Sequence, residues 1–247
     1  MTFNEADKIA DAIKSVSWAD EVVVVDSFSE DDTADIAANL GARIENVPFK
    51  TFGQIRNAAI ATCRHPWVFS LDADERCTRK AQDEILATVQ NSQADAYFVP
   101  RKNWFLGRWV MHSGWYPDYR QPQLFRQGCM QFNEQDEVHE SYTISGTTAY
   151  LTQDIIQIPF KDIEQMLHKM QRYSTLGAKK ITRQGQTGGF WKGLLHGVWG
   201  FFRLYILKRG FLDGAAGFVI AIGNFEGTFY RYAKCAAYKK QSMPPSD

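Results

Sequence analysis

The chain has 247 residues, of which 45% are hydrophobic and 14% aromatic, a composition that excludes a disordered protein. Its 28 basic and 28 acidic side chains are sorted along the sequence: residues 1–140 carry a net charge of −8 and residues 141–247 a net charge of +8, which predicts that the two parts face different surroundings. Four cysteines without a CxxC pair argue against a disulfide framework or a zinc site, and no signal-peptide pattern or run of about 18 apolar residues is found, so we expect a cytoplasmic chain without a membrane-spanning helix.

Strand-like and helix-like segments alternate over the first hundred residues. Helices are predicted over 5–16, 32–40, 53–63 and 78–91, with Asn4 and Thr78 as N-caps, and strands over 21–26, 42–47, 67–71 and 96–100. This alternation predicts an α/β domain with a mostly parallel sheet flanked by helices. A strand is also expected ahead of Thr2, to bring the first helix to the sheet, and the first strand is missing from the sequence as given.

The pattern changes beyond residue 100. Residues 101–126 are predicted to be rich in loops and aromatic side chains, and a long helix is predicted over 162–184. Between 188 and 238, aromatic residues alternate with lysines and arginines. We therefore predict a domain over 1–160, a helical basic-aromatic appendage over 161–240 and a disordered tail over 241–247.

The composition of the appendage is compatible with three kinds of structure. A buried helical pair explains the aromatic residues but leaves the cations without solvent, and no nucleic-acid-binding signature accompanies the basic residues. An interfacial membrane segment explains both, because rings settle at the headgroup boundary and cations face anionic lipid. Residues 161–240 hold 14 basic and 4 acidic side chains. We expect this region to bind an anionic membrane surface and not a nucleic acid.

Two acidic loops follow predicted strands. Asp72 and Asp74 lie two residues apart after the strand at 67–71, in a pattern that can hold Mg²⁺ or Mn²⁺ on diphosphate oxygens or simply cap the next helix. Arg76, at the fifth position of this motif, argues against a phosphohydrolase. Asp26 ends the strand at 21–26 and begins a loop rich in Ser and Thr. A carboxylate at this position can accept a hydrogen bond from a base or a ribose, or it can belong to an ordinary turn between a strand and a helix.

Taken together, the motifs resemble those of family 2 glycosyltransferases with the GT-A fold. The resemblance rests on Thr2-Phe3-Asn4-Glu5, on Val25-Asp26-Ser27 with Ser29, Asp31 and Thr33, on Arg56-Asn57, and on Asp72-Ala73-Asp74, in this order. It extends to the subgroup of lipopolysaccharide or lipooligosaccharide core glucosyltransferases through 71–76, 105–107, 114–118, 124–126, 138–140 and 208–214.

The resemblance implies roles for named residues. Thr2, Asn4, Glu5, Asp26, Arg56, Asn57 and Asp72 would bind the nucleotide-sugar, and Asp74 with Asp72 would hold the divalent metal. The catalytic base of an inverting transfer would be Glu140, with Asp136, Glu137 and His139 in reserve, and His139 more readily orients its neighbour than moves a proton itself. Arg120 and Arg126 would contact acceptor or phosphate groups, or form surface ion pairs.

The sequence thus predicts an inverting hexosyltransferase, with glucose from a UDP-sugar passed to a lipid-linked saccharide such as the lipopolysaccharide inner core, at the inner face of the cell membrane. Two alternatives stay open. One is a glycosyltransferase for capsule or exopolysaccharide on a polyprenyl carrier, and the other is a non-catalytic protein that binds a sugar nucleotide or a membrane. Donor sugar, linkage, acceptor and oligomeric state are not readable from the motifs.

Overall fold

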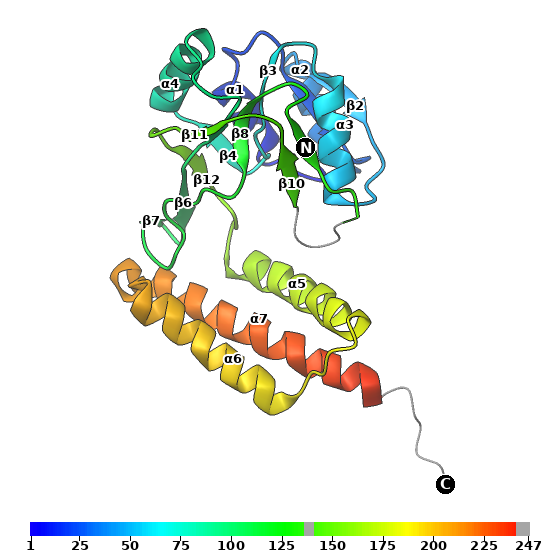
Figure 1. Ribbon diagram of the computed structural model, residues 1–247, viewed down its shortest axis with the longest axis vertical. Helices are drawn as coiled ribbons and strands as arrows, with labels where there is room; N and C mark the ends of the chain where they lie inside the picture. Colours follow the sequence, from blue (N-terminus) through cyan, green and yellow to red (C-terminus); the bar gives the residue numbers. More distant parts are fainter. Residues whose placement is uncertain (136–140, 241–247) are drawn as a thin grey trace. The chain divides into compact units, whose positions relative to one another are not determined.

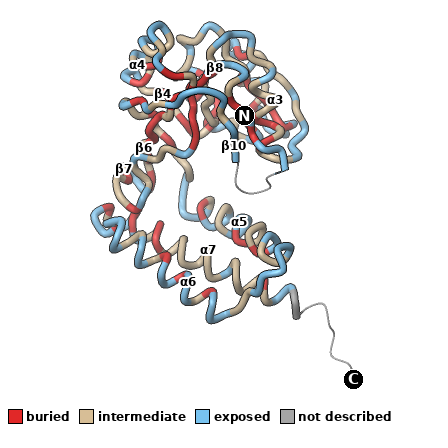
Figure 2. Tube along the Cα trace, viewed as in Figure 1, coloured by how far each residue is buried: buried red, intermediate tan, exposed pale blue. Residues whose placement is uncertain are grey.

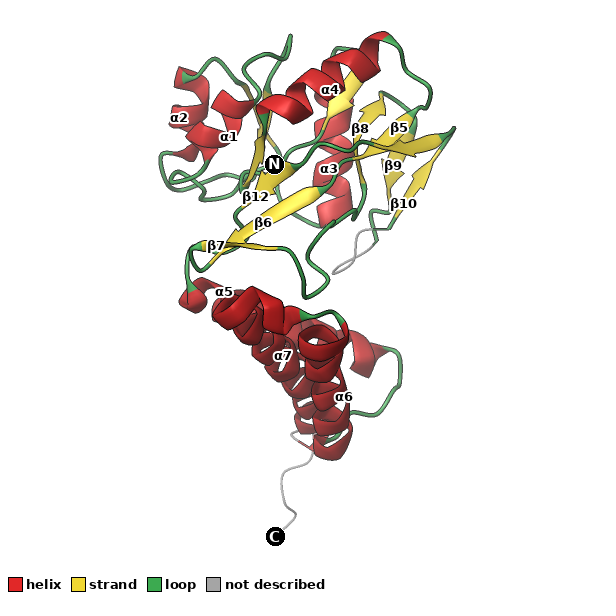
Figure 3. Cartoon of the chain, turned by 90° about the vertical axis from the view of Figure 1, so that its left-hand side faces the viewer, coloured by secondary structure: helices red, strands yellow, loops and turns green. Residues whose placement is uncertain are grey.

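The computed structural model describes residues 1–135 and 141–240 (Figure 1). Contacts divide the chain into two compact units, one of residues 1–102 and 117–158 and one of residues 103–116 and 159 onward. Figure 3 shows that short strands and helices build the first unit and that long helices dominate the second. The predicted tail, 241–247, lies outside the described residues.

Strands and helices alternate in the first unit in the predicted order. The helices are α1 (Ile9–Ser15), α2 (Thr33–Asn39), α3 (Phe52–Thr62) and α4 (Arg79–Gln90). The strands are β1 (Val23–Asp26), β2 (Arg43–Asn46), β3 (Trp67–Phe69), β4 (Glu75–Cys77), β5 (Ala96–Phe98), β8 (Pro122–Arg126), β9 (Met130–Phe132), β10 (Tyr142–Ile144), β11 (Thr148–Tyr150) and β12 (Ile155–Gln157). Thr78 caps α4 by accepting the N–H of Ala81 at 3.1 Å, as predicted. The α/β class is confirmed.

Parallel and antiparallel pairs occur together in this unit. β1 lies parallel to β2, with Val24 opposite Ile44, and β5 lies parallel to β11. β8 lies antiparallel to both β3 and β5, which gives one sheet in the order β11, β5, β8, β3. On the edge of β1 that faces away from β2, a single parallel bridge joins Thr2 to Asp26.

The first half of the chain differs from the prediction in two places. Asn4 does not cap the first helix, because α1 begins at Ile9 and Lys8 takes the N-cap position. Residues 101–126 contain three strands that the sequence pattern does not predict, β6 (Arg101–Phe105), β7 (Arg108–Val110) and β8, with the predicted loop over 111–121 between β7 and β8. In β6 the buried positions are Arg101, Asn103 and Phe105. Since two of these three are polar, the apolar alternation that marks a half-buried strand is absent.

Three helices make up most of the second unit: α5 (Ile163–Arg183), α6 (Phe190–Phe202) and α7 (Gly214–Lys240). A π-helical turn (Arg203–Leu207) and a 3₁₀ turn (Gly210–Asp213) connect α6 to α7. The predicted helix over 162–184 is confirmed as α5, whose first turn is capped by Asp162 through the N–H of Gln165 at 2.8 Å.

Glycines allow α6 and α7 to approach each other closely. A Cβ atom at Gly193 would lie 2.9 Å from the carbonyl oxygen of Phe229, and one at Gly197 would lie 2.9 Å from the ring of Phe225. Gly193, Gly197 and Gly200 are all buried. The two helices therefore pack through small residues of α6, and Phe190 and Phe201 of α6 also reach the rings of Phe229 and Phe218 on α7, at 5.3 and 6.0 Å. Several other large side chains of α6 point away from this contact.

Those large side chains form an exposed apolar face on α6. The face consists of Phe190, Trp191, Leu195, Val198, Trp199 and Phe202, each exposed over at least two fifths of its surface. Figure 2 shows the exposed and buried positions of α6 following one another along the helix. Among the described residues no helix is both long and apolar enough to cross a membrane.

A buried carboxylate organises the other end of the second unit. Asp213, 1% exposed, accepts the N–H groups of Met111 and His112 at 3.1 and 2.9 Å, and Nδ1 of His112 lies 3.0 Å away. The N–H of Ser113 also donates to the carbonyl oxygen of Lys208. Two of the motifs found in the sequence, at 114–118 and 208–214, are thus tied together by backbone contacts next to them.

Candidate functional site

Asp26, the last residue of β1, holds the loop that follows the strand. Asp26 is 1% exposed, and its carboxylate accepts the N–H of Ser29 at 2.7 Å and the hydroxyl of Ser29 at 2.5 Å. Between them, Phe28 adopts a left-handed backbone with φ of 61° and exposes its ring. The carboxylate at the end of the strand is therefore fixed in place before any ligand arrives.

The segment that precedes α1 closes over this loop. The N–H of Asn4 donates to Ser29 Oγ at 2.9 Å, and the side-chain oxygen of Asn4 accepts the N–H of Glu30 at 2.8 Å. The N–H of Glu5 donates to Thr33 Oγ1 at 2.9 Å. The two motifs at residues 2–5 and 26–33 are thus in contact with each other, and Asn4 joins them by hydrogen bonds to Ser29 and Glu30.

The second acidic loop follows β3. Both oxygens of Asp72 face the Arg56 guanidinium, at 3.4 and 3.3 Å from its two terminal nitrogens. Burial on its own raises the pKa of Asp72, but the charges around it, the Arg56 guanidinium first among them, outweigh burial and bring that pKa to about 2. Asp72 is consequently a carboxylate at neutral pH, with a cation from α3 beside it.

A buried ion pair, Glu75 with Arg101, lies next to the turn that carries Asp72 and Asp74. Glu75 and Arg101, 1% and 3% exposed, form an ion pair, and Gln123 Nε2 donates to Glu75 Oε2 at 2.9 Å. The other carboxylate contact is the N–H of Asp72, 3.0 Å from Glu75 Oε2. Burial raises the pKa of Glu75 to about 7, with Asp72 and Asp74 acting in the same direction and Arg101 opposing them. The network fixes the turn that carries both aspartates.

The two loops converge on one place. Ala73, between Asp72 and Asp74, packs in one buried apolar cluster with Val24 of β1, which lies two residues before Asp26. The hydroxyls of Thr2 and Ser27, next to the bridge at Asp26, are buried and have no hydrogen-bond partner among the described residues. Polar atoms without a partner at this depth fit a site that a polar ligand completes.

Asp74 completes the acidic turn. Its side chain lies 3.4 Å from Gln157 Nε2, and its carbonyl oxygen accepts the N–H of Ile158 at 2.8 Å. No group of three or more His, Cys, Asp or Glu residues that could hold a metal occurs among the described residues. Carboxylates at Asp72 and Asp74 still fit Mg²⁺ or Mn²⁺, because such ions take one or two protein carboxylates together with substrate phosphates.

Other predicted site residues lie in different surroundings. The side chain of Asn57 is hydrogen-bonded to the backbone of Phe132. Its oxygen accepts the N–H of Phe132 and its nitrogen donates to the carbonyl oxygen of Phe132, both at 2.9 Å. Arg120 is exposed and pairs with Asp118 at 2.7 Å. Arg126 stacks over the ring of Trp67 at 4.6 Å. Since Trp67 begins β3 and the acidic turn follows its other end, Arg126 is not brought to the site.

The predicted base lies outside the described residues. Asp136, Glu137, His139 and Glu140 all fall in the segment 136–140. On the near side of that segment, Glu134 Oε1 accepts Asn57 Nδ2 at 3.0 Å.

Sequence reasoning missed the buried polar network of Glu75, Arg101 and Gln123. Glu75 belongs to the acidic motif and was visible, but it was given no role, and its partners lie 26 and 48 positions further along the chain. Gln123, a polar residue inside the largely apolar strand β8, is the one signal that the sequence offers for this network.

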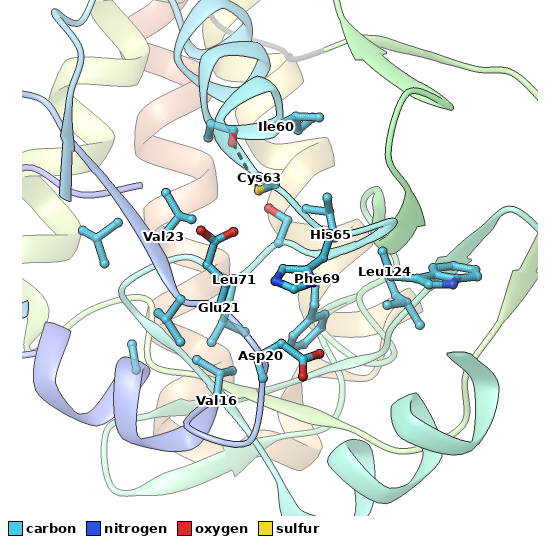
Figure 4. A pocket seen from close by; sticks show the side chains of 18 of the residues that line it. Val16, Asp20, Glu21, Val23, Ile60, Cys63, His65, Phe69, Leu71 and Leu124 are labelled. Atoms are coloured by element: carbon cyan, nitrogen blue, oxygen red, sulfur yellow. Dashed lines mark hydrogen bonds between the residues drawn. The ribbon is translucent and has the colours of Figure 1, made fainter. Parts of the chain in front are cut away.

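An apolar cavity of about 300 Å³ adjoins the site within the first unit. Arg56 and Asp72 lie on its wall, and the other lining residues come from α1, β1, α3, β3 and α4, from the loops next to them, and from Leu124 of β8 and Phe132 of β9. Figure 4 shows the side chains of Val23, Glu21, Leu71, Phe69 and Asp20 among those that line this wall.

Comparison with known sequences gives a consistent picture. The model of glycosyl transferase family 2 matches residues 1–156. An uncharacterized glycosyltransferase of Rickettsia conorii is 28% identical over the whole chain and 92% of its own length. The lipopolysaccharide core biosynthesis glycosyltransferase LpsC of Rhizobium meliloti is 26% identical over 94% of this chain and 88% of its own length.

Comparison with solved structures supports the GT-A fold. Residues 1–349 of S. aureus TarS match 99% of this chain and 91% of that one, with a TM-score of 0.51 and 14% identity. The same part of TarS in complex with UDP matches with a TM-score of 0.50 and 15% identity.

Proposed function

The chain belongs to glycosyl transferase family 2, and from this premise we propose that it transfers a hexose, glucose in the first instance, from a UDP-sugar to a lipid-linked saccharide with inversion at the anomeric carbon. The observation that carries the proposal is the convergence of the Asp26 and Asp72 loops in the first unit, where Ala73 packs in one apolar cluster with Val24 of β1 and the Arg56 guanidinium lies 3.3 Å from Asp72. The similarity to LpsC favours the lipopolysaccharide core as acceptor over a polyprenyl-linked saccharide.

Each loop has a distinct part in donor binding. Asp26, oriented by Ser29, would accept a hydrogen bond from the imide N–H of uracil or from a ribose hydroxyl, and the unpartnered hydroxyls of Thr2 and Ser27 would bind further polar atoms of the nucleotide. Asn4 and Glu5 act by holding the loop in this shape. Arg56 keeps Asp72 ionised and adds positive charge near the diphosphate.

Asp74, with Asp72, would hold the divalent cation, which when bound neutralises charge on the diphosphate leaving group. In the transfer, an acceptor hydroxyl attacks the anomeric carbon, its proton passes to a carboxylate, and the bond to the diphosphate oxygen breaks, so that UDP leaves with the electron pair. Glu140 is the proposed proton acceptor, and Asp136, Glu137 and His139 are held in reserve. Substituting each of these four residues in turn would show which of them accepts the proton. Arg120 is available to contact phosphate groups of the acceptor.

We further propose that region 161–240 attaches the enzyme to the inner face of the cell membrane. The exposed apolar face of α6 supports this, because large apolar side chains turned outward with glycines turned inward suit a helix that lies in lipid. α6 has 13 residues, about 20 Å at 1.5 Å per residue, which is shorter than the hydrocarbon core of a bilayer. Lys192, Arg203, Lys208 and Arg209 are exposed in the same part of the chain and would meet anionic headgroups.

The transfer is tested by incubating the protein with Mn²⁺, a panel of UDP-hexoses and a truncated lipopolysaccharide core. Mass spectrometry should show an acceptor heavier by one hexose with UDP-glucose, and NMR of the new anomeric proton should show inversion. Retention of configuration would overturn the proposed geometry. If no UDP-sugar is consumed with or without acceptor, the protein is a binder and the enzymatic proposal is wrong.

A further inference from the structure

Three aromatic rings gather at one end of the sheet β11, β5, β8, β3. Tyr150 lies opposite Phe98 in the parallel pair of β11 and β5, and their rings stack with centroids 4.9 Å apart. The ring of Tyr119, just ahead of β8, meets the Tyr150 ring edge to face, also at 4.9 Å. We call the rings of Phe98, Tyr119 and Tyr150 the aromatic platform.

The aromatic platform is open to solvent. Tyr150 is 61% exposed, although Phe98 stacks against its ring. On the same face of the sheet, Ala96 is fully buried in a cluster with Phe125 and Phe132, so the β9–β10 pair covers the sheet at Ala96 but not at Tyr150. A single exposed ring needs no explanation, whereas rings that cluster and stay open to water indicate a binding surface.

The platform lies at the same edge of the sheet as the acidic turn. β8 is antiparallel to both β3 and β5, and β11 is parallel to β5, so β3, β5 and β11 run in one direction. Asp72 follows the carboxyl end of β3, and Arg101 comes three residues after Phe98 of β5. Three extended residues span at most about 11 Å. Ligands of open α/β sheets bind at this edge.

A series of contacts joins the platform to the acidic turn. The carbonyl oxygen of Asp118, the residue before Tyr119, accepts Arg101 Nη1 at 3.1 Å. Arg101 pairs with Glu75, whose Oε2 accepts the N–H of Asp72 at 3.0 Å. Because Arg101 and Glu75 are almost completely buried, these contacts fix the platform and the turn relative to each other within the first unit.

Polar groups border the rings. The hydroxyl of Tyr119 donates to Leu151 O at 3.3 Å, and the hydroxyl of Tyr142 donates to Arg120 O at 3.4 Å. Each phenol oxygen can still accept a hydrogen bond, because a hydroxyl has two acceptor lone pairs. Rings beside such acceptors suit a pyranose, whose C–H face can pack on the negatively polarised face of a ring while its hydroxyls find partners.

We propose that the aromatic platform is a subsite for the acceptor saccharide, on which a sugar unit neighbouring the one to be glycosylated stacks against Tyr150. The inference rests on the proposed function and names where its acceptor would bind. A nucleic-acid strand could also stack on the rings, but it requires cations along its backbone, and Arg120 at this place is already paired with Asp118. A saccharide has no such requirement.

The test separates the ring of Tyr150 from its hydroxyl. Tyr150→Phe keeps the stacking face, whereas Tyr150→Thr removes the ring and leaves a residue that suits an edge strand. NMR titration with a lipid-free lipopolysaccharide core oligosaccharide, in the presence of UDP, measures binding. The Kd should rise about fivefold or more in Tyr150→Thr and stay within about twofold of the wild type in Tyr150→Phe. Phe49→Thr, which removes another exposed ring of the first unit, is the control and should bind normally.

The other readouts distinguish a subsite from a structural role. Tyr150→Thr should keep the wild-type affinity for UDP and, in transfer assays, raise KM for the acceptor without changing KM for UDP-glucose. No oligosaccharide binding by the wild type, equal Kd values in Tyr150→Thr and Tyr150→Phe, or a parallel loss of UDP affinity would each overturn the subsite. If the oligosaccharide binds through the Tyr150 ring but no UDP-sugar is consumed, the enzymatic proposal fails and the subsite is supported.

Discussion

The candidate site of the first unit and helix α6 of the second unit differ in what they bury and what they expose. In the first unit, charged and polar side chains are enclosed: Asp26 and Glu75 are each 1% exposed and Arg101 is 3% exposed. In the second unit, glycines occupy the contact of α6 with α7, while Trp191 and Leu195 are 72% and 71% exposed. Burying charges costs free energy unless each charge is paired, and exposing large apolar side chains costs free energy in water. Each is explained by what the unit is proposed to bind, a charged nucleotide-sugar and a lipid surface.

The largest expected effect is on the stability of the first unit. Arg101→Met leaves Glu75 buried without its cation, and loss of one partner of such a pair typically costs about 3–5 kcal/mol. Urea unfolding monitored by circular dichroism should show this loss. Arg79→Met removes the exposed pair with Asp83 and should leave the midpoint almost unchanged. Equal effects of the two variants would mean that the buried pair does not support the site.

Asp74→Asn addresses the chemistry of the same unit. Removing one metal ligand while keeping the side-chain shape should lower kcat by about 10²–10³, since a bound metal contributes several kcal/mol. Initial rates with UDP-glucose and Mn²⁺ measure this, with Asp83→Asn on α4 as the control of equal charge change. Wild-type turnover in Asp74→Asn at saturating metal would remove Asp74 from the metal site.

Gly193→Ala tests the packing of the second unit. The added methyl group would lie 2.9 Å from Phe229 O, so α6 and α7 must separate, at a cost of about 1–3 kcal/mol. Gly189→Ala is the matched control, because nothing lies within 4 Å of a Cβ there. If thermal unfolding is the same for both, the close approach of the helices does not contribute to stability.

The exposed face of α6 gives the smallest expected effect. Trp191→Ser together with Trp199→Ser should weaken binding to vesicles with anionic lipid by about tenfold or more, because two large apolar side chains no longer enter the headgroup region. Co-sedimentation with vesicles measures the change. Phe49→Ser alters an exposed ring of the first unit and should leave binding as it is. Binding insensitive to salt and to anionic lipid would contradict the role of the basic residues.

The sequence predicted those parts of the fold that depend on local pattern. The valine run of β1 and the cap of Thr78 need only neighbouring residues to be recognised, and both were found. β6 was missed because Arg101 and Asn103 face inward, and their partners, Glu75 and the carbonyl oxygen of Trp115, are distant in the sequence. The same limit applies to Asn4. Its motif was recognised, but only folding shows that it clamps the loop at Ser29 and Glu30 rather than capping α1.

The site was predictable to a similar extent. The motifs place Asp26, Asp72 and Asp74 in the predicted site because these residues stand at or just after strand ends, whereas the contact of Asn57 with Phe132 and the stacking of Arg126 on Trp67 depend on tertiary contacts. The sequence does not distinguish one arginine from another. Only the folded structure shows that Arg56 lies beside Asp72, whereas Arg126 lies beside Trp67 at the start of β3.

The most direct test of the central claim compares one acceptor in two forms. Sugar transfer is measured to a lipopolysaccharide core anchored in anionic vesicles and to the same saccharide without its lipid, using the wild-type protein and the variant with both Trp191→Ser and Trp199→Ser. We predict that the variant loses its advantage on vesicles but transfers normally to the lipid-free saccharide, since the first unit is intact. An equal loss on both acceptors, or no loss on either, would contradict the division of labour between the two units.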